Sequence, residues 1–569
     1  MERIDVPVLI VGAGPTGMMT SLLLQRLGVA SRVVERRGGP QRAPAAHAIN
    51  ARTFEICRQA GVDMAALAAA SQDPRDAGAT HWVTRLGGEV LGSLPYERQQ
   101  DEVLAYTPTP LRNLSQHRFE PILLDALLGS GAGAPRYGQR WLAAEQDADG
   151  VTSLVEEVDG GRRHEIRSRY LIAADGAGSP VRKSVGIAQS GPERLQCFIM
   201  MHFAADLRAL VKEHPGVLYW VSDPDCTGVF VAHDLAREWV FMHAFDPDQE
   251  PAESYDAARC EQLVRRAMVR DDVPLEIRSI SSWVMTCQVA ERYRDGRVLL
   301  AGDAAHRFPP TGGLGLNTGV QDAHNLAWKL AAVLDGSAPD ALLDSYQSER
   351  QPVAQYNAEQ SLQNAMRLFE VSTALGVDAD PEVSRRSFAA VLADPARRRA
   401  LSAAIANQAE HFDMLGLQLG FVYEQGALLP NGAEPETIAN RVRDFVPTSR
   451  PGARLPHGWV VRARERCSTL DLIALQRSTL LVGSAGEPWL AAARALAPAL
   501  ACVRIGGDVA DPDGWWSTIA GMSAHGALLV RPDQHVAFRA RGAVADPAAA
   551  LRRALAAVLC SHGDGDRVA

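Results

Sequence analysis

A glycine-rich turn near the start of the chain, GAGPTG at 12–17, constrains the fold more than any other feature. An apolar run of strand length precedes it, a helix is expected from about Pro15 to Leu27, and the next strand ends in Glu35. This spacing is typical of a dinucleotide-binding βαβ unit, in which backbone amides bind the pyrophosphate and the acid binds a ribose. The pattern does not separate NAD from FAD, and a turn that only packs a helix on a strand is the alternative.

A second glycine-rich stretch, RVLLAGDAAHRFPPTGGLGLNTG, lies much later in the chain at 297–319. A strand-like run ends at Gly302-Asp303, a proline and glycine loop follows, and a helix is expected near Asn317. An NAD dehydrogenase has no need of this stretch. A flavin has ribityl hydroxyls that Asp303 could bind and a flat ring that the glycines would let the backbone approach. The ring gains negative charge on reduction, which a helix N-terminus would stabilise.

Between these two stretches the pattern changes. SRYLIAAD (168–175) is another apolar strand that ends in Asp beside Gly, but REWVFMHAF (237–245) alternates with a period of two. That alternation indicates half-buried antiparallel strands in a separate sheet. Residues 380–415 look helical, 446–458 read as a linker, and 459–569 read as a small α/β unit.

Length and composition limit the class of protein. At 569 residues the chain exceeds one compact core, so two or three domains are expected. A net charge of −9 without a long Lys/Arg block argues against nucleic acid as a partner. The eight cysteines are scattered without metal-ligand or CxxC spacing, so we expect reduced thiols and no metal. No stretch fits a signal peptide or a membrane span, which predicts a cytoplasmic protein without a membrane partner.

Three motifs, in this order, carry a specific resemblance: GAGPTG (12–17), DGAGSPVR (175–182) and RVLLAGDAAHRFPPTGGLGLNTGVQDAHNLAWKL (297–330). The sequence resembles the class A flavoprotein aromatic monooxygenases, the para-hydroxybenzoate hydroxylase superfamily. AHAINARTFEICRQAGV (46–62) and a C-terminal part that opens with PGARLPHG (451–458) look like its phenol hydroxylase and 2,4-dichlorophenol 6-monooxygenase branch. That branch ends in a thioredoxin-like domain; this copy has no CxxC, so we expect no disulfide exchange there.

The resemblance implies an α/β fold with three parts. They are a Rossmann-like FAD-binding domain of the GR2 type, an inserted antiparallel sheet that binds substrate, and a C-terminal thioredoxin-like α/β domain. The expected boundaries are 1–190 and 286–370 for the FAD-binding domain, 191–285 for the substrate sheet, 371–450 for a helical segment and linker, and 451–569 for the thioredoxin-like domain.

The resemblance also implies cofactor roles residue by residue. Glu35 would bind the adenosine ribose with Arg36 nearby, Gln116 would contact the ribityl-phosphate region, Asp175 would serve both FAD and NADPH, and Asp303 would bind the ribityl chain. A cap, a turn or a solvated surface residue is the alternative for these positions. The expected FAD contacts are Gly12, Gly14, Pro15, Thr16, Gly17, Glu35, Arg36, Gln116, Asp175, Gly176, Gly302, Asp303, Pro310, Gly313, Leu314, Gly315, Leu316 and Asn317.

His47 is the candidate catalytic residue. It falls where the phenol hydroxylase branch places an acid or base near the substrate hydroxyl, and an imidazole could accept the proton of a phenol. A structural histidine that bonds the backbone is the alternative. Tyr219, Trp220 and His243 on the second sheet are candidate substrate contacts, with core packing as the alternative.

The implied activity is that of a single-component, FAD-dependent hydroxylase. It would use NADPH or NADH and O2 to hydroxylate a phenolic or related electron-rich ring through a flavin C4a-hydroperoxide. The alternatives are an oxygenase of the same fold with a different outcome, Baeyer–Villiger or epoxidation, and a flavin-binding protein without turnover. We also expect a homo-oligomer, a dimer.

Overall fold

The structure, a computed structural model, describes residues 3–378 and 380–561. Its first sheet has a parallel centre with the strand order β19-β10-β1-β2. Because parallel strands finish at a common edge, the turns that follow these four strands meet there. The three sequence motifs therefore lie at one edge of one sheet. The four strands are β1 (Arg3–Val11), β2 (Ser31–Glu35), β10 (Arg163–Ala173) and β19 (Val298–Leu300).

Shorter strands extend this sheet. One short strand pairs with β19 and another with β2, while two longer strands form an antiparallel ribbon on β10. In chain order these strands are β7 (Arg136–Tyr137), β8 (Gln139–Gln146), β9 (Val151–Glu157) and β18 (Arg294–Asp295).

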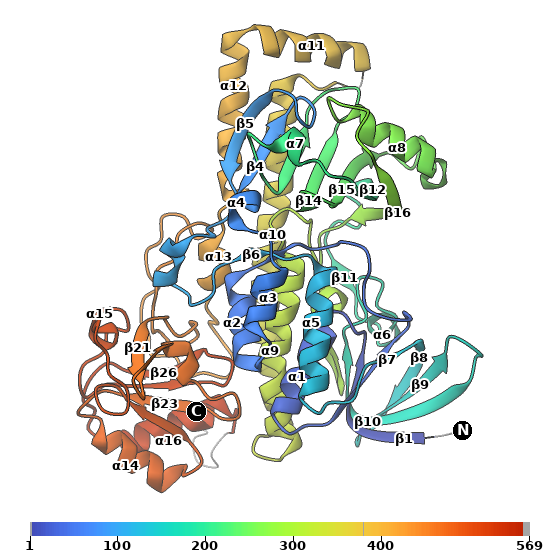
Figure 1. Ribbon diagram of the computed structural model, residues 1–569. Helices are drawn as coiled ribbons and strands as arrows, with labels where there is room; N and C mark the ends of the chain where they lie inside the picture. Colours follow the sequence, from blue (N-terminus) through green and yellow to red (C-terminus); the bar gives the residue numbers. More distant parts are fainter. Residues whose placement is uncertain (1–2, 379, 562–569) are drawn as a thin grey trace.

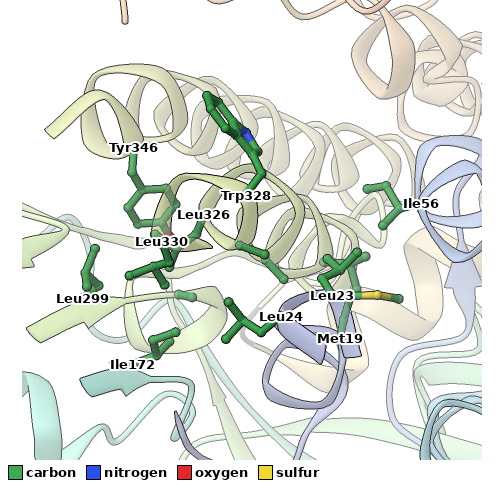
Figure 2. Close-up of a cluster of buried hydrophobic side chains, with 14 of the residues drawn as sticks. Met19, Leu23, Leu24, Ile56, Ile172, Leu299, Leu326, Trp328, Leu330 and Tyr346 are labelled. Carbon is green, nitrogen blue, oxygen red and sulfur yellow. The ribbon is translucent and has the colours of Figure 1, made fainter. Parts of the chain in front are cut away.

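Helices α1 (Pro15–Arg26) and α9 (Leu314–Leu334) pack together on the first sheet. Helix α1 begins at Pro15 as predicted and ends one residue before the predicted Leu27, but α9 begins three residues earlier than expected. Gly313 precedes it in the left-handed region, with φ of 62°, so Asn317 lies inside the first turn. Figure 2 shows Leu24 and Leu326 in the apolar cluster that these two helices share with the sheet. The neighbouring helices are α2 (Ala51–Ala60) and α5 (Gln116–Gly129).

The second sheet has seven strands in the order β16-β12-β15-β14-β13-β4-β5. The expected antiparallel pairing holds for every neighbouring pair except β13 and β4, which run parallel. Two of its strands come from residues 79–95, a part of the chain that was expected in the FAD-binding domain. In chain order the strands are β4 (Ala79–Val83), β5 (Val90–Pro95), β12 (Gln196–Ala204), β13 (Leu218–Val221), β14 (Gly228–Asp234), β15 (Glu238–Phe245) and β16 (Glu276–Met285).

Helices cover both faces of the second sheet (Figure 1). Two short helices pack on one face through a cluster that includes Phe230 and Trp239. The other face packs on three helices through a cluster that includes Trp82 and Val240. The first pair is α7 (Arg208–Val211) and α8 (Ala257–Arg266), and the second group is α10 (Asp344–Leu375), α11 (Pro381–Ala393) and α12 (Pro395–Ala406). Helices α11 and α12 account for most of the helical stretch predicted at 380–415. Helix α10 precedes that stretch and connects the two sheets, because it also packs on α9.

The C-terminal unit contains a βαβ segment followed by a ββα segment, as expected for a thioredoxin-like unit. Its four-stranded sheet has the order β24-β23-β25-β26, in which only β23 and β24 are parallel. A hairpin precedes this sheet. The elements are β21 (Trp459–Arg462), β22 (Glu465–Ser468), β23 (Thr479–Val482), α14 (Glu487–Leu496), β24 (Ala501–Arg504), α15 (Trp515–Thr518), β25 (Ala527–Val530), β26 (Val536–Ala540) and α16 (Pro547–Val558).

Short elements complete the described chain. Within it, no helix combines the length and the apolar character that a bilayer crossing requires. The short strands and helices are β3 (Ala48–Ile49), α3 (Met64–Ala70), α4 (Pro74–Ala77), β6 (Arg112–Asn113), α6 (Pro180–Ser184), β11 (Gln189–Ser190), β17 (Gln288–Ala290), β20 (His306–Arg307) and α13 (Leu415–Leu419).

Buried ion pairs join the C-terminal unit to the rest of the molecule. Arg531, between β25 and β26, pairs with Glu349 of α10 (Nη1 to Oε1, 2.7 Å), which also accepts a hydrogen bond from Lys329 of α9 (2.8 Å). Arg454 donates to Glu55 of α2 (Nε to Oε2, 2.8 Å). All five side chains are buried. Removing one partner would leave a buried charge unpaired, which typically costs 3–5 kcal/mol. The C-terminal unit is therefore a structural part of the same body.

Four glycines allow the motif turns to approach one another. A Cβ atom on Gly12 would lie 2.1 Å from the carbonyl oxygen of Ala174, and one on Gly17 would lie 2.0 Å from the carbonyl oxygen of Gly12. Cβ atoms on Gly302 and Gly319 would lie 2.6 and 2.3 Å from Oγ1 of Thr16. Backbone segments from β1, β10, β19 and α9 therefore pack more closely than any side chain permits.

We predict that Gly319→Ala destabilises the protein although Ala favours helix formation over Gly by roughly 1 kcal/mol. The clash with Thr16 should outweigh that gain, because overpacking a tight interior costs roughly 1–3 kcal/mol. The melting temperature, followed by scanning fluorimetry, should fall. Gly129→Ala is the matched control, since a Cβ there meets nothing within 4 Å and the residue is also helical. An unchanged melting temperature in Gly319→Ala would contradict the packing argument.

Candidate active site

The first helix begins at the shared edge with free backbone donors. Gly14 is the N-cap residue of α1, no side chain caps the helix, and Pro15 follows at its first position. A Cβ on Gly14 would meet nothing within 4 Å, so the backbone there borders open space. The amides of the first helical turn are therefore available to an anionic group.

Glu35 connects two turns at this edge. Its Oε2 accepts a hydrogen bond from the backbone N of Ala13 (2.9 Å), and its Oε1 accepts one from the backbone N of Arg37 (2.9 Å). Burial opposes ionisation, but these amides and the Arg37 guanidinium, 3.2 Å away, hold the pKa of Glu35 below its usual value. The carboxylate is charged at neutral pH and keeps acceptor capacity for a hydroxyl.

Arg36 and Gln116 flank this turn differently. Arg36 is exposed and makes no hydrogen bond or ion pair within the described residues; Arg37 makes the contact with Glu35 instead. Gln116 begins α5, where its backbone N donates to the carbonyl oxygen of Ala46 (2.7 Å) and its side-chain amide donates to Glu120 (2.8 Å). Gln116 therefore lies beside the loop that carries His47.

Asp175 follows β10 with an unsatisfied oxygen. Its Oδ2 accepts a hydrogen bond from the backbone N of Val181 (3.1 Å), but its buried Oδ1 has no protein partner. Burial raises the pKa of Asp175. Gly176 follows in the left-handed region, with φ of 84°, and a Cβ there would meet nothing within 4 Å. A buried acceptor without a partner is uncommon in folded proteins, and it fits a site that a ligand completes.

Asp303 is accessible although protein surrounds it. It is exposed, while Gly302 and Ala304 on either side are buried. Burial nevertheless raises its pKa, against the opposing effect of His306 and Arg307. No described residue donates a hydrogen bond to its carboxylate. Its Oδ1 lies 4.0 Å from the Cβ position of Gly315, so it borders the start of α9.

A second acid, Asp322 of α9, holds the backbone of Gly302, the residue before Asp303. It accepts hydrogen bonds from the backbone N of Gly302 (3.1 Å), from Nε2 of His306 (2.6 Å) and from Nε of Arg350 (2.8 Å). Burial opposes its ionisation, but His306 and Arg350 lower its pKa. His306 therefore has a structural role, and it orients the Gly302-Asp303 turn through Asp322.

The loop between β19 and α9 is held by Asn317. Its Oδ1 accepts from the backbone N of Asn50 (2.9 Å) and from the Thr53 hydroxyl (2.8 Å). Its Nδ2 donates to the carbonyl oxygens of Ala48 (2.8 Å) and Gly313 (2.7 Å). The amide thus joins the 48–50 segment to the start of α9, where no side chain caps the helix. The other predicted residues of this loop are Pro310, Leu314, Gly315 and Leu316.

His47 lies beside this loop, since a Cβ on Gly313 would come within 2.9 Å of the Ala48 side chain. Its Nδ1 is 3.0 Å from Oδ1 of Asn113, whose own amide donates to the carbonyl oxygen of Ala77 (3.2 Å). Because Asn113 presents an acceptor, Nδ1 of His47 carries the hydrogen and Nε2 has the free lone pair. Burial lowers the pKa of His47, and the Asn113 contact partly offsets this.

The three candidate substrate residues fall on different faces of the second sheet. Tyr219 packs toward Trp239 and donates its hydroxyl to the carbonyl oxygen of His214 (3.0 Å). His243 bonds the carbonyl oxygen of Thr227 (2.9 Å) on that same face, which α7 and α8 cover. Trp220 lies on the opposite face, stacked on Trp82. We therefore retain only Trp220 as a candidate, because it shares a cluster with Tyr96.

Several residues at this site were not found from the sequence. Tyr96 lies with its ring centroid 6.0 Å from that of His47, and the buried His233, hydrogen-bonded to Ser115, lies 5.9 Å away. Asn113 and Glu97 also belong to this group. Asp322 carried a signal, since it lies inside the third motif. The others are ordinary residues in ordinary local patterns, so only the tertiary structure identifies them.

Two family models match the chain. The FAD binding domain model matches residues 5–361, and the aromatic-ring hydroxylase C-terminal model matches residues 448–561. Between them, residues 362–447 are matched by neither model.

Full-length relatives match as well. The chain is 36% identical over 589 aligned residues to a tetracenomycin A2 monooxygenase-dioxygenase of Streptomyces glaucescens, with 98% of each chain covered. It is 34% identical over 584 aligned residues to a 2,4-dichlorophenol 6-monooxygenase of Delftia acidovorans, with 98% of this chain and 99% of the relative covered. Among solved structures, the flavin-dependent monooxygenase PieE in complex with FAD and substrate is 36% identical with a TM-score of 0.91, covering 99% of this chain and 100% of that one.

We predict that Asn317→Asp lowers the melting temperature, because a carboxylate cannot donate to the carbonyl oxygens of Ala48 and Gly313. Leaving such buried groups unpaired costs about 1–3 kcal/mol. Asn431→Asp is the matched control: Asn431 is exposed and only accepts, from the backbone N of Ala433. Equal melting temperatures for the two variants would show that Asn317 does not hold this loop.

Proposed function

Because the chain belongs to the family of FAD-dependent aromatic-ring hydroxylases, we propose that it hydroxylates a phenolic or related electron-rich aromatic ring, using O2 and NAD(P)H. The observation that carries this proposal is the meeting of three motifs and His47 at one sheet edge. The turns after β1, β10 and β19 pack against one another there, and the 46–50 segment contacts the loop after β19. Relatives named as a putative polyketide hydroxylase and as a 2,4-dichlorophenol 6-monooxygenase support an aromatic substrate without choosing between these two classes.

The donors and acceptors at this edge fit FAD. Two helices, α1 and α9, begin there without side-chain caps, which suits a pyrophosphate and a flavin ring that carries negative charge. Glu35 and Asp303 supply acceptors for hydroxyls at the two ends of the edge, and Asp175 has an unpaired buried oxygen between them. Three strand spacings separate β2 from β19, about 14 Å. A ligand that contacts both acids must be as extended as a dinucleotide.

Within the proposed complex, this chain's residues would divide the cofactor contacts by position. Gly12, Gly14 and Gly17 would allow the pyrophosphate to approach the α1 backbone, and Glu35 would bind the adenosine ribose. Asp303, oriented through Gly302 and Asp322, would bind the ribityl chain. The loop that Asn317 fixes would border the ring. Bound FAD supplies the redox chemistry that activates O2 for transfer to the aromatic ring.

His47 is the proposed base that accepts the proton of the substrate hydroxyl. Its lowered pKa keeps the imidazole neutral at neutral pH, and the Asn113 contact leaves the Nε2 lone pair free. Removing the phenolic proton makes the ring a better nucleophile. Protonation removes the free lone pair of His47. The rate of hydroxylation should therefore decline as pH falls through the pKa of His47, which lies below the usual histidine value.

Two further expectations belong to this proposal. We propose that the protein acts as a homodimer in the cytoplasm; light scattering after gel filtration tests the dimer. NADPH and NADH are both compatible with the family, and comparison of the two as reductants decides between them.

The decisive experiment is a substrate screen on the purified protein. A flavin absorbance band near 450 nm, NAD(P)H consumption stimulated by phenols or polyketide phenols, and a product heavier by one oxygen atom would together support hydroxylation. A lactone product would favour a Baeyer–Villiger outcome. Bound FAD without stimulated NAD(P)H consumption across the panel would favour a flavin-binding protein without turnover.

We predict that His47→Ala lowers the rate of hydroxylation by at least about 10²-fold, the lower range for a lost general base. Reduction of the flavin by NAD(P)H should change little, because that half-reaction does not require the substrate's proton to leave. Stopped-flow measurements of the two half-reactions check this. His525→Ala, an exposed histidine of the C-terminal unit, is the control. An equal loss in both half-reactions would remove His47 from the proton role.

A further inference from the structure

Glu97 holds an unusual place next to the candidate site. It follows β5 directly after Tyr96, whose ring lies near His47. Its backbone is in the left-handed region, with φ of 54°, which is unfavourable for a residue with a side chain. Such a conformation persists only where surrounding contacts hold it, and it is found most often at functional sites.

The contacts that hold Glu97 all come from one distant segment, residues 412–418. The backbone N of Glu97 donates to the carbonyl oxygen of Phe412 (2.6 Å). Its Oε2 accepts hydrogen bonds from the backbone N of Met414 (3.1 Å) and from the side-chain amide of Gln418 (3.0 Å). One residue thus fixes both ends of the 412–418 segment.

That segment contacts the loop proposed to border the flavin ring. A Cβ on Gly312 would lie 3.0 Å from Cε of Met414, and Met414 shares an apolar cluster with Leu314. Phe412 packs against Tyr96 on the other side, with ring centroids 6.0 Å apart. Met414 therefore connects Glu97 to the 312–314 loop, and Tyr96 connects Glu97 to His47.

We propose that Glu97 is a positioning residue, which holds Met414 against the 312–314 loop and so keeps the ring-binding side of the site in its working geometry. This inference rests on the proposed function, because it assigns Glu97 a part in the same hydroxylation. No sequence signal marks this residue, since YERQQ (96–100) reads as an ordinary polar loop.

The charge state of Glu97 follows from its surroundings. Burial raises the pKa of Glu97 to about 8; the amide of Met414 opposes this, the nearby Asp413 adds to it, and Arg98 partly offsets it. Arg98 is itself engaged with Asp413 (Nε to Oδ1, 2.8 Å), so it does not serve as a free counter-ion. At neutral pH the carboxyl is mostly protonated. Above pH 8 it gains a poorly compensated charge, which favours movement toward water and release of Met414.

Glu97→Gln tests this assignment, because the amide oxygen of Gln can accept the same two hydrogen bonds and cannot ionise. In the wild-type holoenzyme, the fraction of NAD(P)H consumption that yields hydroxylated product should fall as pH rises from 7 to 9. In Glu97→Gln that fraction should stay constant over the same range. Glu102→Gln, an exposed neighbour, should behave as wild type. An alkaline decline in Glu97→Gln as steep as that of wild type would overturn the proposal.

A second measurement does not depend on turnover. Because the folded pKa of Glu97 is raised, the unfolded chain ionises first, so wild-type stability falls relative to Glu97→Gln as pH rises from about 5 to 8 and then levels off. The difference in melting temperature should grow over that window. A difference that stays constant would overturn the charge assignment. A wild-type protein without bound FAD or substrate-stimulated NAD(P)H consumption would instead reject the proposed function.

Met414→Ala separates the positioning role from the charge. It should lower the yield of product per NAD(P)H at every pH and remove most of the alkaline decline, because the side chain that ionised Glu97 would release is already absent. A yield equal to wild type would show that Met414 does not transmit the effect of Glu97 to the loop.

Discussion

The contact of two glycine backbones with the side chain of Thr16 is the constraint on which this molecule depends. Gly302 lies in the turn that follows β19 and Gly319 lies one turn inside α9, so both can approach α1 only without side chains. This contact fixes α1, α9 and the β19 turn relative to one another. The uncapped start of α1 at Gly14 and the unpaired carboxylate oxygens of Asp175 and Asp303 therefore keep fixed positions relative to one another at this edge. Sequence segments that are far apart become one binding surface because of close packing at a few atoms.

Buried charge forms a second layer behind this surface. Asp322 fixes Gly302 from below and pairs with Arg350, while Glu349, the neighbour of Arg350 on α10, pairs with Arg531 of the C-terminal unit. The C-terminal unit thus contributes counter-ions to the helices that carry the candidate site. Its lack of a CxxC motif fits a structural role of this kind.

Much of the fold was predictable because strong local signals marked it. The glycine spacings, the acids after the strands and the period-two stretch predicted the first sheet, the motif turns and the second sheet. Prediction failed where tertiary contacts determine the local structure. Helix α9 begins early because Gly313 takes a left-handed conformation. Strand β4 joins the second sheet by a parallel pairing that no local pattern reveals. Tyr219 and Trp220 are neighbours with similar chemistry, and only the sheet register separates their faces. Glu97 depends on contacts with residues over three hundred positions away.

The second sheet is assembled from two stretches of chain, 79–95 and 196–285, and this division has an evolutionary consequence. The hairpin of β4 and β5 leads directly into Tyr96 and Glu97, and so belongs to the side that carries the proposed base and the proposed support of the ring loop. The later strands form the broad remainder of the sheet. If the second sheet forms the proposed substrate wall, mutations in those later strands reshape that wall while the hairpin stays unchanged. Such a division lets a lineage diversify in the molecules it accepts without redesigning its chemistry.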